Sequence, residues 1–459
     1  MIVEKPLADL QTALNNTASG STCSATGLYR VGATPLRIPA GVRLYGHDGA
    51  LWLVGSRNWQ TGGEAGNTWA PSLTGWLSSR SLPTITREEP GGITYVDKAA
   101  ALQYEHVYGV LSNGDIRDLP FLIAENRRIW LTEDPRHFER IEVPEFNAHW
   151  FWPGGDGVTL DGVTMRFMSS GPVSDPAGSH NTNRFVMTRC VVGDCHGAGL
   201  NVGGSKDVSI SQTLIERCGG SGLLSNNVDG FAMAGVSINQ CGAGGWNNDW
   251  GGGATKFTGT TNHTVTDCYV HDCAGYGLWW DEACRGPIKV DRTLVESNWG
   301  PAFMFEISYG PVNVTSSAFA YTTRGSGWPV VYVSSSAGPV TFDNCLFVAG
   351  AGQGRAIQIS DDSRITTPTS DIHWKGSRMI LEGNQSNMSD GVWINDRASA
   401  VGKNISGDGT AVAGAFRMQA GTPAREYTRA TDWNATQWED NSVEADAATA
   451  RGWRDRREF

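Results

Sequence analysis

The sequence predicts an all-β protein built as a parallel β-helix, a solenoid of similar coils, and three observations support this fold. First, one segment pattern occurs five times without internal gaps, beginning at Phe185, Val208, Phe231, His263 and Ile288. The starts are 23, 23, 32 and 25 residues apart, and a repeat of this length is typical of a solenoid. Second, apolar residues alternate with small or polar residues at the start of each segment, which is the period of a β-strand. Third, a glycine-rich corner leads into another short strand, so each coil contains two or three strands.

Two other repeat architectures fit the sequence less well. A β-propeller needs blades of roughly 40 to 45 residues, which is longer than the observed repeat. Helical repeats are disfavoured because the segments are dense in Val, Thr, Phe and Gly, which are poor helix formers. Further copies of the strand pattern on both sides bring the total to nine coils, the first beginning at Val158 and the last at Ile372.

The length and composition favour one long domain. A solenoid grows by adding coils, so 459 residues need not be divided into several ordinary domains. The 58 glycines and the 18% of charged residues suit a turn-rich β fold. The net charge of −11 argues against a nucleic acid or an anionic membrane as partner, and it counts mildly against a polyanionic substrate. No stretch approaches the length and hydrophobicity of a transmembrane segment.

The first residues do not read as an export signal. The stretch MIVEKPLADLQTALNN has an acidic residue and a proline where a signal peptide carries basic residues and an apolar core. We therefore expect a mature fragment, export by another route, or release by cell lysis. Each of these is compatible with an extracellular or virion-associated location.

Most of the nine cysteines occupy two repeated positions. One position holds Cys195, Cys218, Cys241 and Cys273. The other holds Cys190, Cys268 and Cys345, and in other coils Thr213, Thr293 and Ser317. A metal site or reactive thiols would need a CxxC pair or a His partner at ligand spacing, and neither is present. We expect ladders of buried free thiols that pack as small hydrophobic groups.

Four parts follow along the chain: an N-terminal cap (1–30), an irregular β region with inserted loops (31–156), the regular parallel β-helix (157–399) and a C-terminal strap or tail (400–459). Within 3–15, a helix that covers the first coil is predicted by the spacing of Leu7, Leu10, Ala13 and Leu14. The stretch from Trp59 to Tyr95 is expected to be an inserted loop region. The stretch from Ile116 to Val143 is expected to form an antiparallel subdomain or irregular coils.

The alternation predicts which residues of the second strand face outward. The inward residues are expected to be Trp246, Asn248, Leu278, Trp280, Phe303 and Phe305. The outward residues are expected to be Asn247, Asp249, Trp279, Asp281, Met304 and Glu306. Asp249, Asp281 and Glu306 would then share one outward position on three successive coils.

Such a stack of carboxylates suits acid–base chemistry. Adjacent strands lie about 4.7 to 4.9 Å apart, and like charges at that spacing favour one protonated acid beside one ionised base. Glycoside hydrolysis needs that combination. The alternatives are a solvated acidic face and a calcium site.

An extra loop and several aromatic residues are expected near these carboxylates. The stretch DWGGGATKFTGTTN accounts for the single 32-residue step and is expected to project Lys256 and Trp250 toward them. Aromatic rings stack on the apolar faces of sugars. The predicted catalytic residues are Asp281, Glu306, Asp249 and Lys256. The predicted substrate-binding residues are Trp250, Trp279, Trp299 and Tyr309, while Trp246 is expected to be core. No metal ligand is assigned.

At GGGATKF, CYVHDCAGYGLWWDE and FMFEISYG the sequence resembles the right-handed parallel β-helix repeat proteins of bacteria and their phages. These include polysaccharide lyases, glycoside hydrolases and phage tailspikes. The resemblance covers about Gly157 to Asn395 and implies a right-handed coil and a carbohydrate ligand. The NTD and GHG motifs of polygalacturonases are absent, since Asn181-Thr182-Asn183 lacks the acid, and so is the DPHD motif of alginate epimerases. A pectate-lyase arrangement would need calcium carboxylates beside a basic residue, which Asp281, Glu306 and Lys256 would imitate.

Two functional hypotheses remain open. In the first, the protein is an enzyme that cleaves a cell-surface or environmental polysaccharide, either by hydrolysis without a cofactor or by β-elimination with calcium. In the second, it is a non-catalytic virion protein, a receptor-binding or structural tail component. The expected partner is a polysaccharide or glycan, with a homotrimer or other virion proteins as further partners, and without nucleic acid or membrane. A third and more distant hypothesis is that the protein is a purely structural spacer.

Overall fold

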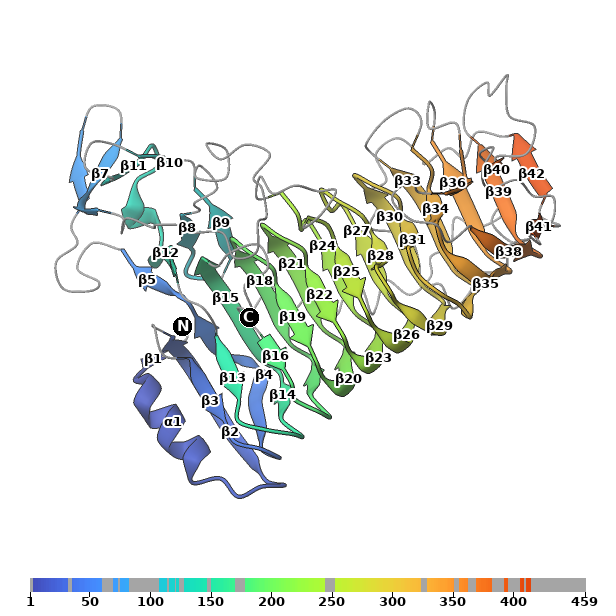
Figure 1. Cartoon of the computed structure of the whole chain (residues 1–459). Helices are drawn as coiled ribbons and strands as arrows, with labels where there is room; N and C mark the ends of the chain where they lie inside the picture. Colours follow the sequence, from blue (N-terminus) through green and yellow to red (C-terminus); the bar gives the residue numbers. More distant parts are fainter. Residues whose placement is uncertain are drawn as a thin grey trace.

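The computed structural model confirms the parallel β-helix (Figure 1). Its strands follow one another along the coil axis in chain order, from the N-terminal coils to the C-terminal ones. The structure describes residues 3–413 apart from 32–34, 60–68, 73–74, 82–106, 114, 120, 124–127, 147–149, 170–177, 244–251, 323–327, 351–354, 362–368, 382–391, 395–404 and 408–409.

Each regular coil carries three strands, and equivalent strands of successive coils pair in parallel and in register. Ladder 1 consists of β14 (Thr159–Asp161), β17 (Val186–Thr188), β20 (Lys206–Ser211), β23 (Asp229–Ala234), β26 (Thr261–Thr266), β29 (Arg285–Asp291), β32 (Val312–Thr315), β35 (Ala337–Asp343), β38 (Ser370–Lys375) and β41 (Ile405–Gly407). Ladder 2 consists of β15 (Val163–Ser169), β18 (Val191–Cys195), β21 (Leu214–Cys218), β24 (Ser237–Asn239), β27 (Tyr269–His271), β30 (Leu294–Asn298), β33 (Ala318–Thr322), β36 (Leu346–Ala349), β39 (Arg378–Leu381) and β42 (Thr410–Ala413). Both ladders belong to one 27-stranded sheet.

Ladder 3 forms a separate nine-stranded sheet. It consists of β16 (Gly178–His180), β19 (Leu200–Gly203), β22 (Leu223–Asn226), β25 (Thr255–Thr258), β28 (Leu278–Asp281), β31 (Phe303–Glu306), β34 (Val331–Ser334), β37 (Ile357–Ser360) and β40 (Val392–Ile394). These are the second strands that the glycine-rich corners predict.

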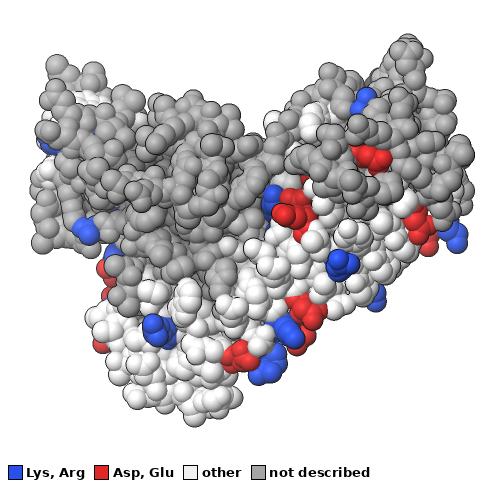
Figure 2. Space-filling model, viewed as in Figure 1, with Lys and Arg blue, Asp and Glu red and all other residues white. Residues whose placement is uncertain are grey.

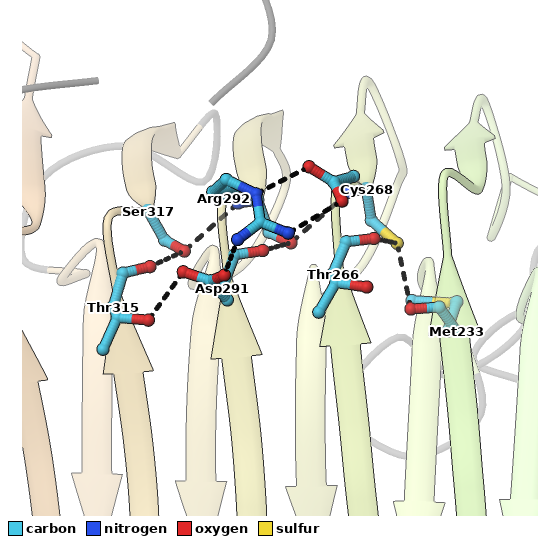
Figure 3. Close-up of polar contacts among 9 residues, drawn as sticks. Met233, Thr266, Cys268, Asp291, Arg292, Thr315 and Ser317 are labelled. Atoms are coloured by element: carbon cyan, nitrogen blue, oxygen red, sulfur yellow. Dashed lines mark hydrogen bonds and ion pairs between the residues drawn. The ribbon is translucent and has the colours of Figure 1, made fainter. Parts of the chain in front are cut away.

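The corner between ladders 1 and 2 explains the second cysteine position. One residue in the left-handed region, such as Arg292 at φ 45°, turns the chain, and a small polar residue follows it. Thr293 Oγ1 donates to the carbonyl oxygen of Asp291 at 3.1 Å and accepts the backbone N–H of Cys268 at 3.4 Å. The backbone N–H of Thr293 in turn donates to Ser317 Oγ at 3.1 Å. Contacts of this kind link neighbouring coils through buried polar atoms, and Figure 3 shows the corner with Cys268, Arg292 and Ser317 labelled.

The nine cysteines are all free and buried, as the repeat predicts. Burial raises the pKa of the Cys190, Cys268 and Cys345 thiols to about 12, which makes them unreactive. In-register strands keep equivalent residues side by side along the ladder.

Thiol titration of the denatured, unreduced protein should therefore find close to nine free thiols. The reason is that these side chains lie inside the coil, where they serve as packing groups. A titration that finds one thiol or none would contradict the ladders.

The helix predicted within 3–15 is confirmed as α1 (Leu7–Asn15), which buries Leu10 and Leu14. Next to it lies β3 (Leu36–Ile38), whose only strand neighbour in the described part of the chain is β13 (Phe151–Pro153). Gln11 satisfies backbone groups of β3, because its side chain accepts from the Arg37 N–H at 2.8 Å and donates to the Arg37 carbonyl at 2.9 Å. The helix thus protects a strand edge. Among the described residues, no helix is long and apolar enough to cross a membrane.

The parallel coil extends beyond the predicted 157–399 at both ends. On the N-terminal side, β1 (Glu4–Lys5) pairs with β2 (Thr22–Arg30), and β2 and β4 (Arg43–Val54) are long strands that pair in parallel with each other. β4 also pairs in parallel with both β14 and β15. On the C-terminal side, β41 and β42 continue the ladders to Ala413. The structure does not describe residues 414–459, so the predicted tail lies mostly outside it.

The stretch from Ile116 to Val143 takes the antiparallel form of the two that the sequence allows. β12 (Arg140–Phe146) pairs antiparallel with β5 (Ser56–Asn58) and with β8 (Tyr108–Val110), which pairs with β9 (Ile116–Asp118). A four-stranded antiparallel sheet combines β6 (Trp69–Pro71), β7 (Trp76–Ser81), β10 (Phe121–Ile123) and β11 (Arg128–Leu131). A short 3-10 helix, η3 (Pro135–His137), precedes β12. These strands lie beside the N-terminal coils (Figure 1).

Candidate functional site

The outer face of ladder 3 presents two rows of side chains, because alternate residues of each strand point away from the coil. The register gives the first outer row as Leu224, Lys256, Trp279, Met304, Tyr332 and Gln358. It gives the second outer row as Asn226, Thr258, Asp281, Glu306, Ser334 and Ser360. The predicted outward direction of Trp279, Asp281, Met304 and Glu306 agrees with this register, and the predicted inward residues Leu278, Trp280, Phe303 and Phe305 are core.

Three charged residues meet on these rows. Lys256 Nζ lies 2.9 Å from Asp281 Oδ2, and it lies 3.8 Å from the ring centre of Trp279. The side chains of Lys256 and Asp281 are 12% and 14% exposed. Glu306 follows Phe305, the register partner of Trp280, so it stands beside Asp281 on the next strand and is 7% exposed. The site therefore combines one ammonium group with two carboxyl groups at the edge of solvent.

The predicted place of Asp249 is wrong. Thr258 is the register partner of Asp281, so the 32-residue step places its extra residues before β25. Lys256 accordingly lies on a strand instead of on a projecting loop. The Gly-Trp pair at 245–246 resembles the start of a strand in the sequence. The strand of ladder 3 in this coil is instead β25, which lies between β22 and β28. Trp246, Asn247, Asn248, Asp249 and Trp250 lie outside the described residues.

Trp279 points away from the coil but is only 2% exposed, which corrects its prediction as an open sugar platform. Its ring packs edge-on against Tyr276 at 4.6 Å, and Met304 lies in the same cluster. The partly buried aromatic residues of this cluster are Trp328 and Tyr332, whose rings are 6.4 Å apart. These two residues, and not Trp279, offer partly exposed aromatic surface next to the first outer row.

The structure places Trp299 and Tyr309 at opposite ends of β31. Trp299 lies on the corner before the strand and Tyr309 on the corner after it, and both are partly exposed. The Tyr309 ring stacks on the guanidinium group of Arg285 at 4.7 Å. The two residues are thus not brought together into one platform.

The sequence reasoning missed a second polar cluster, on the outer face of ladder 2. The Tyr269 hydroxyl donates to Glu296 Oε1 at 2.7 Å, and the Tyr269 ring stacks on His271 at 4.0 Å. His271 Nδ1 lies 2.8 Å from Asp272 Oδ2. Burial raises the pKa of Glu296 to about 7, against the opposing effect of the Tyr269 hydrogen bond. The available sequence signal was the pair Tyr269 and His271, two residues apart on one strand. Glu296 itself is buried, with 2% of its surface exposed.

The surface charge is mixed. On the face shown in Figure 2, basic and acidic side chains lie next to one another along the lower edge of the molecule. This face shows no extended basic area among the described residues. Within the described part of the chain, no three His, Cys, Asp or Glu side chains are grouped as a metal site.

Comparisons with known proteins agree with the fold. Residues 178–325 match the family model of the right handed beta helix region, in agreement with a right-handed coil. The structure of XylC with xylose superposes with a TM-score of 0.58 at 13% identity, covering 82% of this chain and 73% of that one. The A-modules of the Azotobacter vinelandii mannuronan C-5 epimerases AlgE6 and AlgE4 give TM-scores of 0.55 and 0.50 at 12% and 10% identity. They cover 89% and 88% of this chain and 96% and 91% of their own. Among curated proteins, no sequence matches.

Proposed function

We propose that the protein hydrolyses glycosidic bonds in a neutral polysaccharide, at the outer face of β28 and β31. The observation that carries this proposal is the Lys256–Asp281 ion pair with Glu306 on the adjacent strand. The transition state of glycoside hydrolysis resembles an oxocarbenium ion and develops positive charge. As Glu306 gives up its proton, its carboxylate and that of Asp281 face the developing positive charge and stabilise it.

The charges of the site and of the whole chain disfavour the alternative of β-elimination. Elimination from a uronate develops negative charge on the sugar, and it needs cations to neutralise the sugar carboxylate. Lys256 already pairs with Asp281, and the chain carries a net charge of −11. A neutral sugar chain therefore fits the site better than a polyanion.

The two carboxyl groups have different surroundings and hence different proposed roles. Asp281 pairs with the Lys256 ammonium through Oδ2, and its other oxygen attacks the anomeric carbon. Glu306 is the more buried residue, and burial favours the neutral form of a carboxylic acid. As the bond from the anomeric carbon to the leaving oxygen breaks, that oxygen takes the bonding electron pair and the Glu306 proton. In the second step, water attacks the anomeric carbon, Glu306 takes its proton, and Asp281 is released.

The register also supports retention of the anomeric configuration. Neighbouring strands are about 4.7 to 4.9 Å apart, and retaining enzymes hold their carboxyl groups about 5 to 5.5 Å apart, without room for a water between them.

The proposed hydrolysis needs no metal, so a chelator should leave activity unchanged. The solved structures support a carbohydrate substrate, because one holds xylose and two are named for mannuronan. We place the reaction where polysaccharides are exposed, outside cells or at a virion surface.

Asp281→Asn and Glu306→Gln should each lower turnover of a polysaccharide substrate by about a hundredfold or more. The two variants should differ on an aryl glycoside with an activated leaving group. Such a group leaves without a proton, so Glu306→Gln should recover the first step while Asp281→Asn should not. Reducing-end release from a polysaccharide panel and aryl glycoside turnover are the measurements.

The matched control is Asp272→Asn, which changes an exposed carboxylate on the ladder 2 side. It should retain activity. Full activity in both Asp281→Asn and Glu306→Gln would place the site elsewhere. Unsaturated uronate products that depend on Lys256 and calcium would replace hydrolysis by elimination. Glycan binding without any turnover would instead make the protein a binding component, such as a virion receptor-binding protein.

A further inference from the structure

We infer the direction in which the substrate lies on ladder 3: the leaving sugar occupies the side of Trp328 and Tyr332, and the sugar that Asp281 attacks occupies the side of Lys256 and Thr258. This inference rests on the proposed hydrolysis and adds the polarity of binding and the residues of the leaving-group subsite. The polysaccharide then runs along the coil axis, across the strands.

The order of the strands along ladder 3 sets the order of the side chains along the coil axis. Along ladder 3 the sequence is β25, β28, β31, β34, so Lys256 and Thr258 come first, Asp281 second, Glu306 third and Tyr332 fourth (Figure 1). Each strand adds about 4.7 to 4.9 Å along the axis. Asp281 and Glu306 therefore differ in axial position by one strand.

The chemistry of the two carboxyl groups turns that order into a direction. The nucleophile must lie beneath the anomeric carbon of the sugar that is attacked, and the acid must reach the oxygen of the sugar that leaves. Glu306 lies one strand nearer to Tyr332 than Asp281 does. The leaving oxygen, and the sugar attached to it, consequently lie toward β34.

The side chains on the two sides differ in the way that this direction requires. Toward β34, the Tyr332 hydroxyl accepts from Ser360 Oγ at 2.7 Å. The Trp328 ring, just before β34, lies 6.4 Å from Tyr332 and reaches back to 6.5 Å from Tyr276, which precedes β28. This fixed aromatic surface suits the apolar face of a leaving sugar. Toward β25, Thr258 and Lys256 offer polar groups to the attacked sugar.

The test compares an oligosaccharide with an aryl glycoside of the same attacked sugar, because only the oligosaccharide places a sugar in the leaving-group subsite. Trp328→Ala should lower the ratio of kcat/KM for the oligosaccharide to kcat/KM for the aryl glycoside about tenfold, the size of an aromatic contact. Tyr332→Phe, which keeps the ring, should change the ratio in the same direction by less. Thr258→Val should lower both values alike and leave the ratio unchanged.

Trp152→Ala is the matched control, since it removes a partly exposed tryptophan on β13, in the first coils, and should leave both values unchanged. A melting curve for each variant separates lost folding from lost binding. If Thr258→Val changes the ratio and Trp328→Ala does not, the direction is reversed. If Glu306→Gln is inactive but Trp328→Ala lowers both values equally, only the polarity is wrong. If Glu306→Gln is fully active, the proposed function is wrong and the polarity fails with it.

Discussion

His263→Phe should keep the protein folded in acid under conditions in which the wild type unfolds. His263 takes an inward core position on β26, between Phe231 and Ile288 on the neighbouring coils. Its ring lies 5.0 Å from both Phe231 and Phe257. Nδ1 accepts the indole N–H of Trp280 at 3.3 Å, so the proton is on Nε2, which has no hydrogen-bond partner among the described residues.

Burial lowers the pKa of His263 from 6.5 to about 3. Between these values the unfolded chain binds a proton that the folded protein does not, so the free energy of unfolding falls as the pH falls from about 6.5 to 3. At about 1.4 kcal/mol for each tenfold difference in proton affinity, this residue accounts for about 4 to 5 kcal/mol. Above pH 6.5 it contributes no pH dependence. Phenylalanine has no proton to take up, and it matches the neighbouring Phe231.

Urea denaturation at several pH values between 7 and 3 checks this result. The two proteins should be of similar stability at pH 7 and diverge progressively as the pH falls. His271→Asn is the control, because His271 lies on the outer face beside Asp272 and its removal should leave the acid dependence in place. Parallel curves for the wild type and His263→Phe would show that the folded protein accommodates a protonated His263.

Arg166→Met should destabilise the protein by about 3 to 5 kcal/mol, as the loss of one partner from a buried ion pair does. Arg166 lies on β15, buried, and forms ion pairs with Asp194 and with Glu216, the latter at 2.9 Å. Arg217 completes the network, at 2.6 Å from Asp194 and 2.9 Å from Glu216. Burial would raise the pKa of Asp194, but Arg217 and Arg166 outweigh it and lower that pKa to about 2. The network is balanced, with two cations and two anions.

Methionine keeps much of the arginine volume, so the loss should come from the charge that remains unbalanced. Combining Arg166→Met with Glu216→Gln restores one cation for one anion and should recover part of the lost stability. Thermal and urea denaturation of the wild type, both single variants and the double variant measure the coupling. Two results would mean that the groups do not act as a network. One is a loss of stability below about 1 kcal/mol in Arg166→Met, and the other is a loss in the double variant equal to the sum of the losses in the two single variants.

The repeat pattern predicted the coil because its cause is local. Alternation forces Val208 and Ile210 to one side of a strand, and the same pattern one repeat later gives Phe231 and Met233 the same side. In-register stacking then follows, and with it the cysteine ladders. The outward direction of Asp281 and Glu306 is a consequence of the same alternation. The error at Asp249 arose where an insertion lies next to a strand, since a pattern of period two does not show on which side of the strand the extra residues fall.

By itself the sequence determined the solenoid, the helix that caps it, the positions of the free thiols and the equivalent positions of Asp281 and Glu306 on adjacent strands. Each of these depends only on the alternation of neighbouring residues and on the length of the repeat. Tertiary structure alone decided that Trp279 is covered, that Lys256 reaches Asp281 from the preceding strand, and that Glu296 is buried on an outward face. Exposure and charge pairing on the outer face depend on which side chains of neighbouring coils meet there, and the alternation within one strand does not specify those contacts.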